Sequence, residues 1–261
     1  MITGRGRAPI APEVWSTLEE DVKEALEQHF IGRRVVDFDG PHGLAHAALN
    51  LGSLERRDLG QGTIAGLRSV LPLLEVRVPF ELSRAALDAR ERGAPDLDDD
   101  AALAAAQKLA ELEDRAIFYG LEPAHIRGQL AASSHPRIPL GGDVAATIDA
   151  VAQALLVLDQ ALVKGPYALV LGDAAYRRLA SAPEYPPLRQ LRELVGGRVL
   201  HSRVLRGGIV LSMRGGDYQL TVGQDAAIGY QSHDADKVAL YLVQSFTFHV
   251  MSPEAIVGLE E

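Results

Sequence analysis

The stretch DDDAALAAAQKLAELEDRAIFYG, residues 98–120, predicts the long helix around which the rest of the chain is organised. Its apolar residues recur in steps of three and four, so they form one stripe along a helix of about 30 Å. The aspartates at its start suit a helix cap, Gly120 suits its end, and Glu111 and Arg115 are spaced to pair. The stripe consists of Ala102, Ala105, Leu109, Leu112, Ala116 and Tyr119. Because half of these residues are alanine, we expect this helix to lie closely against a sheet.

The composition excludes several classes of protein. The net charge of −9 argues against a nucleic-acid coat, which needs basic surfaces to neutralise phosphates. The chain has no cysteine, so thiol catalysis, disulfides and thiolate metal sites are excluded. Its apolar runs are too short to span a membrane, and residues 1–7 lack the apolar core of a signal peptide. We therefore expect a cytoplasmic protein.

The rest of the chain predicts an α+β fold. Helical periodicity occurs at 13–30, 84–92, 144–162, 174–179 and 188–194. Strand-like runs occur at 33–38, 73–82, 167–171, 209–213, 218–222 and 238–250. The turn sequence RGGD at 214–217 predicts a hairpin between the two strands that flank it. Residues 49–74 contain four glycines and few large apolar side chains, so we expect a projecting hairpin or loop that needs a neighbour.

The motifs that resemble active sites have simpler explanations. The run GQGTIAG at 60–66 has no buried strand before it, which favours a loop over a dinucleotide site. His42 and His46 are four residues apart but follow a Gly-Pro turn and enclose no glutamate. No G-x-S-x-G motif is present, and the remaining histidines lack metal-ligand spacing. The sequence thus predicts an assembly unit and not an enzyme.

The sequence resembles the encapsulins, bacterial nanocompartment shell proteins that share the Hong Kong 97-type phage capsid fold. The matching stretches follow one another in order through nearly the whole chain. They include GRRVVD at 32–37, ERG at 91–93, IFYG at 117–120, GPY at 165–167, RGGD at 214–217, GQD at 223–225, IGY at 228–230 and FTF at 246–248. Each stretch alone is weak evidence, but their order and spacing together are specific.

The resemblance implies three structural parts and a closed icosahedral shell. A peripheral domain would comprise residues 1–46, 76–131 and 220–261, with the N-terminal helix and the long helix of residues 98–120. An extended loop would comprise residues 47–75 and lie across a neighbouring subunit, where its apolar side chains become buried. An axial domain would comprise residues 132–219. The shell would contain about 60 copies or a small multiple of that number.

The resemblance also implies where a cargo enzyme binds. In the family, the C-terminal targeting peptide of the cargo docks on the inner face, between the N-terminal helix and the peripheral domain. The groove here would include Leu18, Val22, Arg33, Asp37 and Ile228, although Leu18 and Val22 also fit ordinary core positions. A disordered tail can bind such a groove weakly, because many identical sites face one enclosed volume. The family's usual cargoes are a ferritin-like iron oxidase and a dye-decolorising peroxidase.

Two further implications concern the pore and a flavin. The loop SAPEYPP at 181–187 falls where family members line the fivefold pore, so Ser181, Pro183, Glu184 and Tyr185 would be pore-lining and Glu184 would favour cations. Some family members bind a flavin on a tryptophan in the helix after the Phe80-type strand. Ala85 occupies that position here, so the stacking platform is missing and we expect no cofactor.

Two alternatives remain open at this point. The first is a phage-type major capsid protein that packages DNA, which the acidic net charge disfavours. The second, which has less support, is a nucleotide-binding oxidoreductase that uses the glycine run at 60–66.

Overall fold

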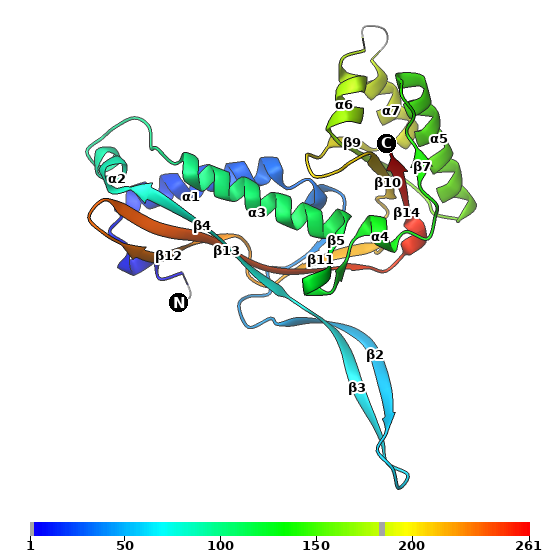
Figure 1. The fold of residues 1–261 in the computed structure, drawn as a ribbon, viewed down its shortest axis with the longest axis horizontal. Helices are drawn as coiled ribbons and strands as arrows, with labels where there is room; N and C mark the ends of the chain where they lie inside the picture. The colour runs from blue at the N-terminus through cyan, green and yellow to red at the C-terminus, as the bar shows by residue number, and fades with distance from the viewer. Residues whose placement is uncertain (1–2, 183–185) are drawn as a thin grey trace.

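The computed structural model describes residues 3–182 and 186–261, which form two sheet-based domains and a projecting hairpin (Figure 1). The α-helices are α1 (Pro12–His29), α2 (Arg84–Glu91), α3 (Asp100–Phe118), α4 (Gln129–Ala132), α5 (Val144–Gln160), α6 (Asp173–Ala180) and α7 (Pro187–Val195). The strands are β1 (Asp37–Asp39), β2 (Ala48–Asp58), β3 (Ile64–Pro72), β4 (Leu74–Ser83), β5 (Gly120–Leu121), β6 (Ile126–Arg127), β7 (Ile138–Pro139), β8 (Tyr167–Leu171), β9 (Arg198–His201), β10 (Gly208–Ser212), β11 (Tyr218–Val222), β12 (Ala227–His233), β13 (Lys237–Val250) and β14 (Ile256–Glu260). The 3₁₀ turns are η1 (Arg5–Arg7), η2 (Gly32–Arg34), η3 (Glu122–Ala124) and η4 (Pro253–Ala255). The α+β prediction is confirmed.

Helix α3 lies across the first sheet, as its alanine-rich stripe predicts. It packs against β4 and β13, and α1 runs alongside it on the same face (Figure 1). Ala102, Ala105, Ala106 and Ala110 are all buried, so the backbones of α3 and its neighbours approach closely. The helix ends before Gly120, whose φ of +95° is a conformation that glycine adopts readily. The predicted long helix and its place on a sheet are confirmed.

The buried face of α3 is wider than the predicted stripe. Both α1 and the sheet cover the helix, so Glu113 and Asp114 are also buried, at 0% and 2% exposure. The expected Asp cap is absent, because the Asp99 side chain accepts no hydrogen bond from the first turn. The expected pairing of Glu111 with Arg115 was wrong as well, since Glu111 instead accepts a 2.7 Å hydrogen bond from Gln107 Nε2.

The first sheet has the strand order β1-β11-β13-β12. Strand β4 also pairs with β13 and completes the five-stranded sheet. The ladder between β4 and β13 is long and antiparallel. Alternate residues of β4 point inward, and Phe80 and Leu82 are buried at 7% and 2% exposure. Pro79 lies on β4, which is an edge strand. Within the described part of the chain, no strand pairs with the outer side of β4, so a missing N–H there costs no hydrogen bond between strands.

The second sheet has the order β7-β14-β10-β8-β9 and carries α5, α6 and α7 (Figure 1). Strand β14 belongs to this sheet and pairs with β10. Residues 256–260 therefore belong to the second sheet; the family resemblance implies a peripheral domain that includes 220–261. Ile256, Val257 and Leu259 are buried on both faces of the sheet, so β14 lacks the alternation of a half-exposed strand.

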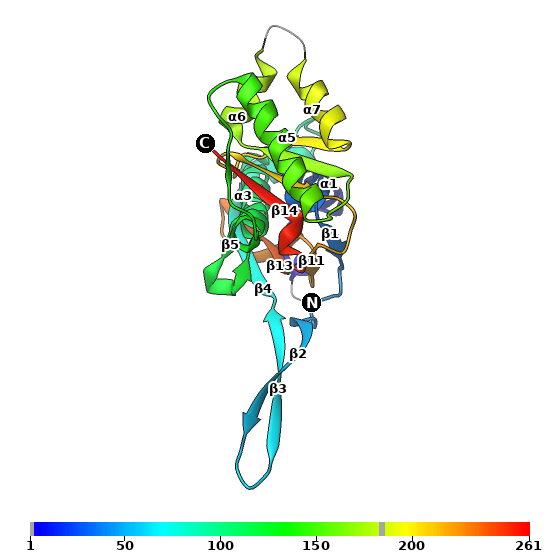
Figure 2. The same ribbon diagram turned by 90° about the vertical axis from the view of Figure 1, so that its right-hand side faces the viewer.

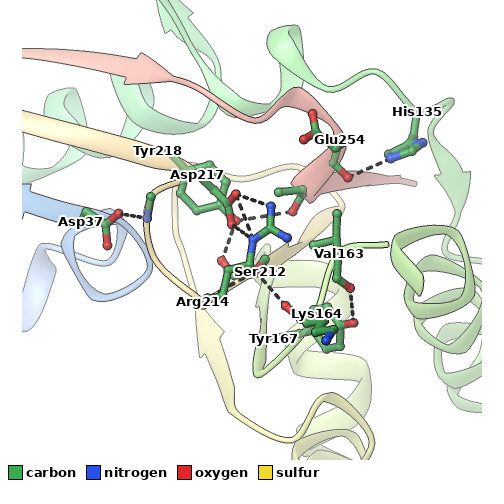
Figure 3. A network of polar contacts seen from close by, with 12 residues as sticks. Asp37, His135, Val163, Lys164, Tyr167, Ser212, Arg214, Asp217, Tyr218 and Glu254 are labelled. Carbon is green, nitrogen blue, oxygen red and sulfur yellow. Dashed lines mark hydrogen bonds and ion pairs between the residues drawn. The ribbon is translucent and has the colours of Figure 1, made fainter. Parts of the chain in front are cut away.

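The turn at residues 214–217 does not close a hairpin, contrary to the prediction. Strand β10 before it pairs with β14 and β8 in the second sheet, whereas β11 after it pairs with β1 and β13 in the first. The turn therefore connects the two domains. Arg214 Nη2 and Nε donate to the Asp217 carboxylate at 2.7 and 3.0 Å, and the Gly216 N–H donates to Asp37 Oδ2 at 2.6 Å (Figure 3). These bonds fix the junction.

Strands β2 and β3 form the projecting hairpin predicted for residues 49–74, and it extends well away from both sheets (Figures 1 and 2). The glycine run at 60–66 forms its tip, where the Thr63 N–H donates to the Gly60 carbonyl at 3.0 Å. Leu54, Ile64 and Leu67 on this hairpin are 59%, 69% and 56% exposed. By the strand register, Leu54 and Ile64 share one face of the hairpin and Leu67 lies on the other. Both faces therefore carry exposed apolar side chains, as surfaces that contact another chain do.

Candidate functional site

A pocket of about 570 Å³ opens between α1 and the first residues of β12. It lies on the flank of α1, and the N-terminal residues close one side of it. The lining residues are Thr3, Arg5, Glu19, Val22, Lys23, Leu26, Glu27, Phe30, Arg33, Asp225, Ala226, Ala227 and Ile228. Its volume slightly exceeds that of a second hollow of about 530 Å³ between α3 and residues 203–206.

The floor of this pocket is apolar and belongs to the packed core. Val22, Leu26 and Phe30 follow one another at steps of four, so one face of α1 and its end present them together. Ile228 approaches from β12 on the opposite side. These four residues are at most 7% exposed, because they pack on the core beneath α1 and α3. The floor is therefore rigid and presents hydrocarbon to a ligand.

The charges on the rim neutralise one another. Arg5 pairs with Glu19 at 2.8 Å, and the Tyr230 N–H holds the N-terminal segment by donating to the Thr3 carbonyl at 2.7 Å. Lys23 lies 3.8 Å from Glu27 one helical turn later. The third cation of the lining, Arg33, is paired as well. The pocket thus carries three positive and three negative side chains and has no strong preference for an ion of either sign.

The side chain of Arg33 is held by two carboxylates. Its Nε and Nη2 donate to the two oxygens of Glu113 at 2.7 and 2.8 Å, and Nη2 also donates to Asp225 at 3.0 Å. The guanidinium lies 3.8 Å from the ring centre of Phe30. Burial disfavours the charge of Arg33, but the hydrogen bonds and charges of Glu113 and Asp225 outweigh burial and raise its pKa. Arg33 is therefore a fixed wall of the pocket.

The carboxylates behind Arg33 are buried acids. Burial raises the pKa of Glu113 above its usual value, while Arg33 and a hydrogen bond from Gln244 act in the opposite direction. Burial also raises the pKa of Asp114 to about 8, although its carboxylate accepts hydrogen bonds from the backbone N–H of Gly32 at 2.7 Å and Ile31 at 3.2 Å. These bonds hold the turn after α1, which carries Arg33, against α3.

The structure brings together three of the five residues that the resemblance implies for the groove. Val22, Arg33 and Ile228 line the pocket. Leu18 is fully buried one turn before Val22 and faces the core. Asp37 lies outside the pocket at the domain junction, where it accepts the Gly216 N–H. In place of the strand predicted at 33–38, the structure has the turn η2 followed by the short strand β1. Arg33 belongs to η2 and Asp37 to β1, so the two residues lie in different elements.

Several residues of this site were not identified from the sequence. Leu26 and Phe30 continue the spacing of Val22, so the helical pattern of α1 already contained that signal. Gln244 interrupts the inward-facing apolar positions of β13 and is fully buried, which signals a polar partner across the sheet. That partner is Glu113. A buried glutamate in an amphipathic helix gives no such local signal, because charged residues normally face solvent.

The remaining predicted sites are placed as follows. Helix α6 ends at Ala180 and α7 begins at Pro187, and Ser181 is exposed between them. Pro183, Glu184 and Tyr185 lie outside the described residues. Ala85 lies in the first turn of α2. Within residues 3–182 and 186–261, no group of three or more His, Asp or Glu side chains could hold a metal ion, and no helix is long and apolar enough to cross a membrane.

Comparison with known proteins agrees with this architecture. The family model described as encapsulating protein for peroxidase (Linocin_M18) matches residues 1–247. The type 1 encapsulin shell protein of Rhodococcus erythropolis is 41% identical over 258 residues, which cover 98% of each chain. A virus-like particle from Pyrococcus furiosus has a TM-score of 0.68 at 16% identity and covers 94% of this chain and 98% of that chain. The capsid of Myoviridae phage XM1 has a TM-score of 0.53 at 15% identity, covering 86% and 89%.

Proposed function

This chain belongs to the Linocin_M18 family of encapsulin shell proteins, and we propose that its pocket between α1 and β12 holds a targeting peptide of a cargo enzyme. Its fold is the Hong Kong 97-type capsid fold, and its function is to form a closed icosahedral shell. The shell comprises about 60 copies, and the subunit itself catalyses no reaction. The compartment resides in the cytoplasm.

The apolar floor with a charge-balanced rim carries the proposal. A ligand gains affinity there by burying hydrocarbon side chains against Val22, Leu26 and Ile228. The paired rim charges offer an ion no uncompensated partner, which favours an extended, largely apolar peptide over a charged small molecule. Low affinity at each pocket suffices, because the shell presents many copies of the pocket to one enclosed volume.

The cargo is an enzyme with a flexible C-terminal tail. The description of the family model names a peroxidase, and a dye-decolorising peroxidase or a ferritin-like protein is the guest that we propose. Their tails would lie along α1 with apolar side chains toward Ile228. Arg33 and Asp225, held in a fixed geometry, would limit the length of the side chains that fit beside them.

Co-expression with a tagged reporter tests this role of the pocket. A fluorescent protein fused to the C-terminal tail of a dye-decolorising peroxidase should co-purify with wild-type shells. Ile228→Glu places a charge on the apolar floor and should yield shells that lack the reporter. Leu162→Glu, at a side chain 84% exposed and distant from the pocket, is the matched control and should load normally. Equal loading of Ile228→Glu and control shells would contradict the proposal.

The hairpin β2–β3 makes the contact between subunits. Its exposed Leu54, Ile64 and Leu67 become buried on a neighbouring copy, which gives the hairpin a partner that its own subunit does not provide. On the family resemblance we also propose that Ser181, Pro183, Glu184 and Tyr185 contribute to the fivefold pore and that Glu184 favours the passage of cations; residues 183–185 lie outside the described part of the chain. Shells with Glu184→Gln should admit metal ions more slowly than wild-type shells, as measured by uptake into preformed particles.

The shell binds no flavin. Ala85 provides no aromatic surface, and the Arg77 guanidinium is engaged by Glu75 at 2.9 Å and by the ring of Tyr241 at 5.0 Å from its centre. Purified shells should therefore be colourless, and flavin absorbance that persists after dialysis would refute this.

A further inference from the structure

A second hollow, on the other side of α3 from the sheet core, is lined by three arginines. It has a volume of about 530 Å³ and lies between the C-terminal half of α3 and the loop that connects β9 to β10. Its lining consists of Glu111, Arg115, Tyr119, Gly120, Arg203, Val204, Leu205 and Arg206. Arg203 also lines an adjoining hollow of about 210 Å³ that reaches the end of α1. Neither the shell fold nor the cargo pocket accounts for this site.

The three guanidinium groups lack acidic partners. Among the described residues, none of Arg115, Arg203 and Arg206 takes part in an ion pair, although most other charged side chains near the cargo pocket do. The one carboxylate in the lining, Glu111, is engaged by Gln107. All three arginines are exposed, so solvent screens their mutual repulsion, and an anion bound between them would be attracted by each of them.

Two further observations support the binding of an anion in this hollow. The Arg206 N–H donates to the Tyr119 hydroxyl at 2.8 Å, so the phenolic O–H is left to donate to another acceptor. The pKa of His29 in the adjoining hollow is lowered, first by burial and then by the positive charge of Arg203. Glu111 acts on this pKa in the opposite direction. The lining of the larger hollow nevertheless carries three arginines and one glutamate, in a chain whose net charge is −9. Guanidinium groups and hydroxyls together are typical ligands of phosphate oxygens.

We propose that the hollow between α3 and residues 203–206 binds a small phosphate anion, which Arg115, Arg203, Arg206 and the Tyr119 hydroxyl coordinate. The anion neutralises the three arginines and connects α3 of the first domain to the β9–β10 loop of the second. This site is independent of the cargo pocket, because the two hollows share no lining residue.

Equilibrium dialysis of intact shells against inorganic phosphate in 150 mM chloride tests the proposal. Wild-type shells should bind phosphate saturably with about one site per subunit, and phosphate should raise their Tm. The double variant R203Q/R206Q should bind at least about tenfold more weakly, because it loses two charge-assisted donors. The control R92Q/R192Q removes the same net charge at exposed positions outside the hollow and should bind as wild type does.

Two results would overturn the proposal. Wild-type shells could show no saturable phosphate binding above chloride, or the control could lose as much binding as R203Q/R206Q. If the first result is combined with failure of R203Q/R206Q to form shells, these arginines are assigned to a contact between copies. Tyr119→Phe provides a milder test that retains all three charges, and it should weaken binding several-fold.

Discussion

Arg33 and Glu113 form a largely buried ion pair between the turn after α1 and helix α3. The Glu113 side chain is 0% exposed and that of Arg33 is 17% exposed, so water cannot reach Glu113 to take the place of Arg33. Glu113→Ala would leave the guanidinium with Asp225 alone and would remove the acceptor for Gln244 Nε2. Breaking a buried ion pair costs about 3–5 kcal/mol, and the cost here lies in the lower part of that range because Asp225 still pairs with Arg33. An unsatisfied buried donor costs about 1–3 kcal/mol. We expect Glu113→Ala to destabilise the subunit by about 4–6 kcal/mol.

Thermal unfolding of assembled shells, followed by the fluorescence of the buried Trp15, measures this effect. For a chain of this size a loss of about 5 kcal/mol corresponds to a decrease in Tm of about 10 °C or more. Glu111→Ala, two residues earlier on the same helix, is the control and should change Tm little, because Glu111 has one hydrogen bond near the surface. Glu113→Ala should also reduce cargo loading, since Arg33 would lose its fixed position in the pocket.

The double variant R33M/E113L separates the charge effect from simple loss of packing. Replacing both members of a buried pair by apolar residues of similar size is often nearly neutral, so this variant should recover about half of the lost stability. A decrease in Tm for Glu113→Ala no larger than that for Glu111→Ala would refute the reasoning. A double variant less stable than Glu113→Ala would refute it as well.

Three further predictions follow from other parts of the structure. The folded-state pKa of Asp114 is raised to about 8 from its ordinary value of 3.8, so the folded state binds the extra proton and stability is lost as the pH rises from about 4 through 8. Asp114→Asn should flatten the dependence of Tm on pH between 6 and 9, and an unchanged slope would exclude Asp114 as its origin. Gly229→Ala would place a Cβ 2.2 Å from the ring of Tyr241 and should lower the stability by about 1–3 kcal/mol in denaturant unfolding, whereas wild-type stability would mean that the ring moves freely. Ile64→Asp, at a hairpin side chain 69% exposed, should impair shell assembly in size-exclusion chromatography while the circular dichroism of the subunit is retained. Thr63→Asp at the hairpin turn is its control and should assemble, and normal assembly of Ile64→Asp would exclude this contact.

Local patterns in the sequence predict much of the fold. Helices α1 and α3 and strand β13 carry clear periodicity, and β8 is a short apolar run. The predicted ranges of all four differ from the observed ones by a few residues at most. The projecting hairpin at 49–74 was predicted from its four glycines and the run of charged residues at 55–58. These features are determined by residues that are close together in the sequence, so they can be predicted from a single sequence.

The errors concern which sheet a strand joins. The sequence around Arg214 and Asp217 has the composition of a tight turn, yet its two flanking strands enter different sheets. Strand β14 is apolar on both faces and could fill a place in either sheet by pattern alone. Pairing partners are decided by packing between distant segments, so local turn chemistry could not identify them.

For the candidate site, the resemblance to a family supplied residues that periodicity could not. Val22 and Ile228 look like ordinary core positions, and at 4% and 7% exposure they nearly are. The buried Glu113 was missed, because a charge within an amphipathic helix is normally assigned to its solvent face. The polar Gln244 within an apolar strand was the one sequence signal that pointed to it.

Electron microscopy of the purified protein, combined with sedimentation velocity, is the most direct test of the claim that these subunits enclose a compartment. We predict closed, hollow icosahedral particles of uniform diameter, with density for a peptide along α1 when cargo is co-expressed. Protein that remains a single subunit or dimer at all salt concentrations and pH values tested, with no closed particle in the images, would contradict the account.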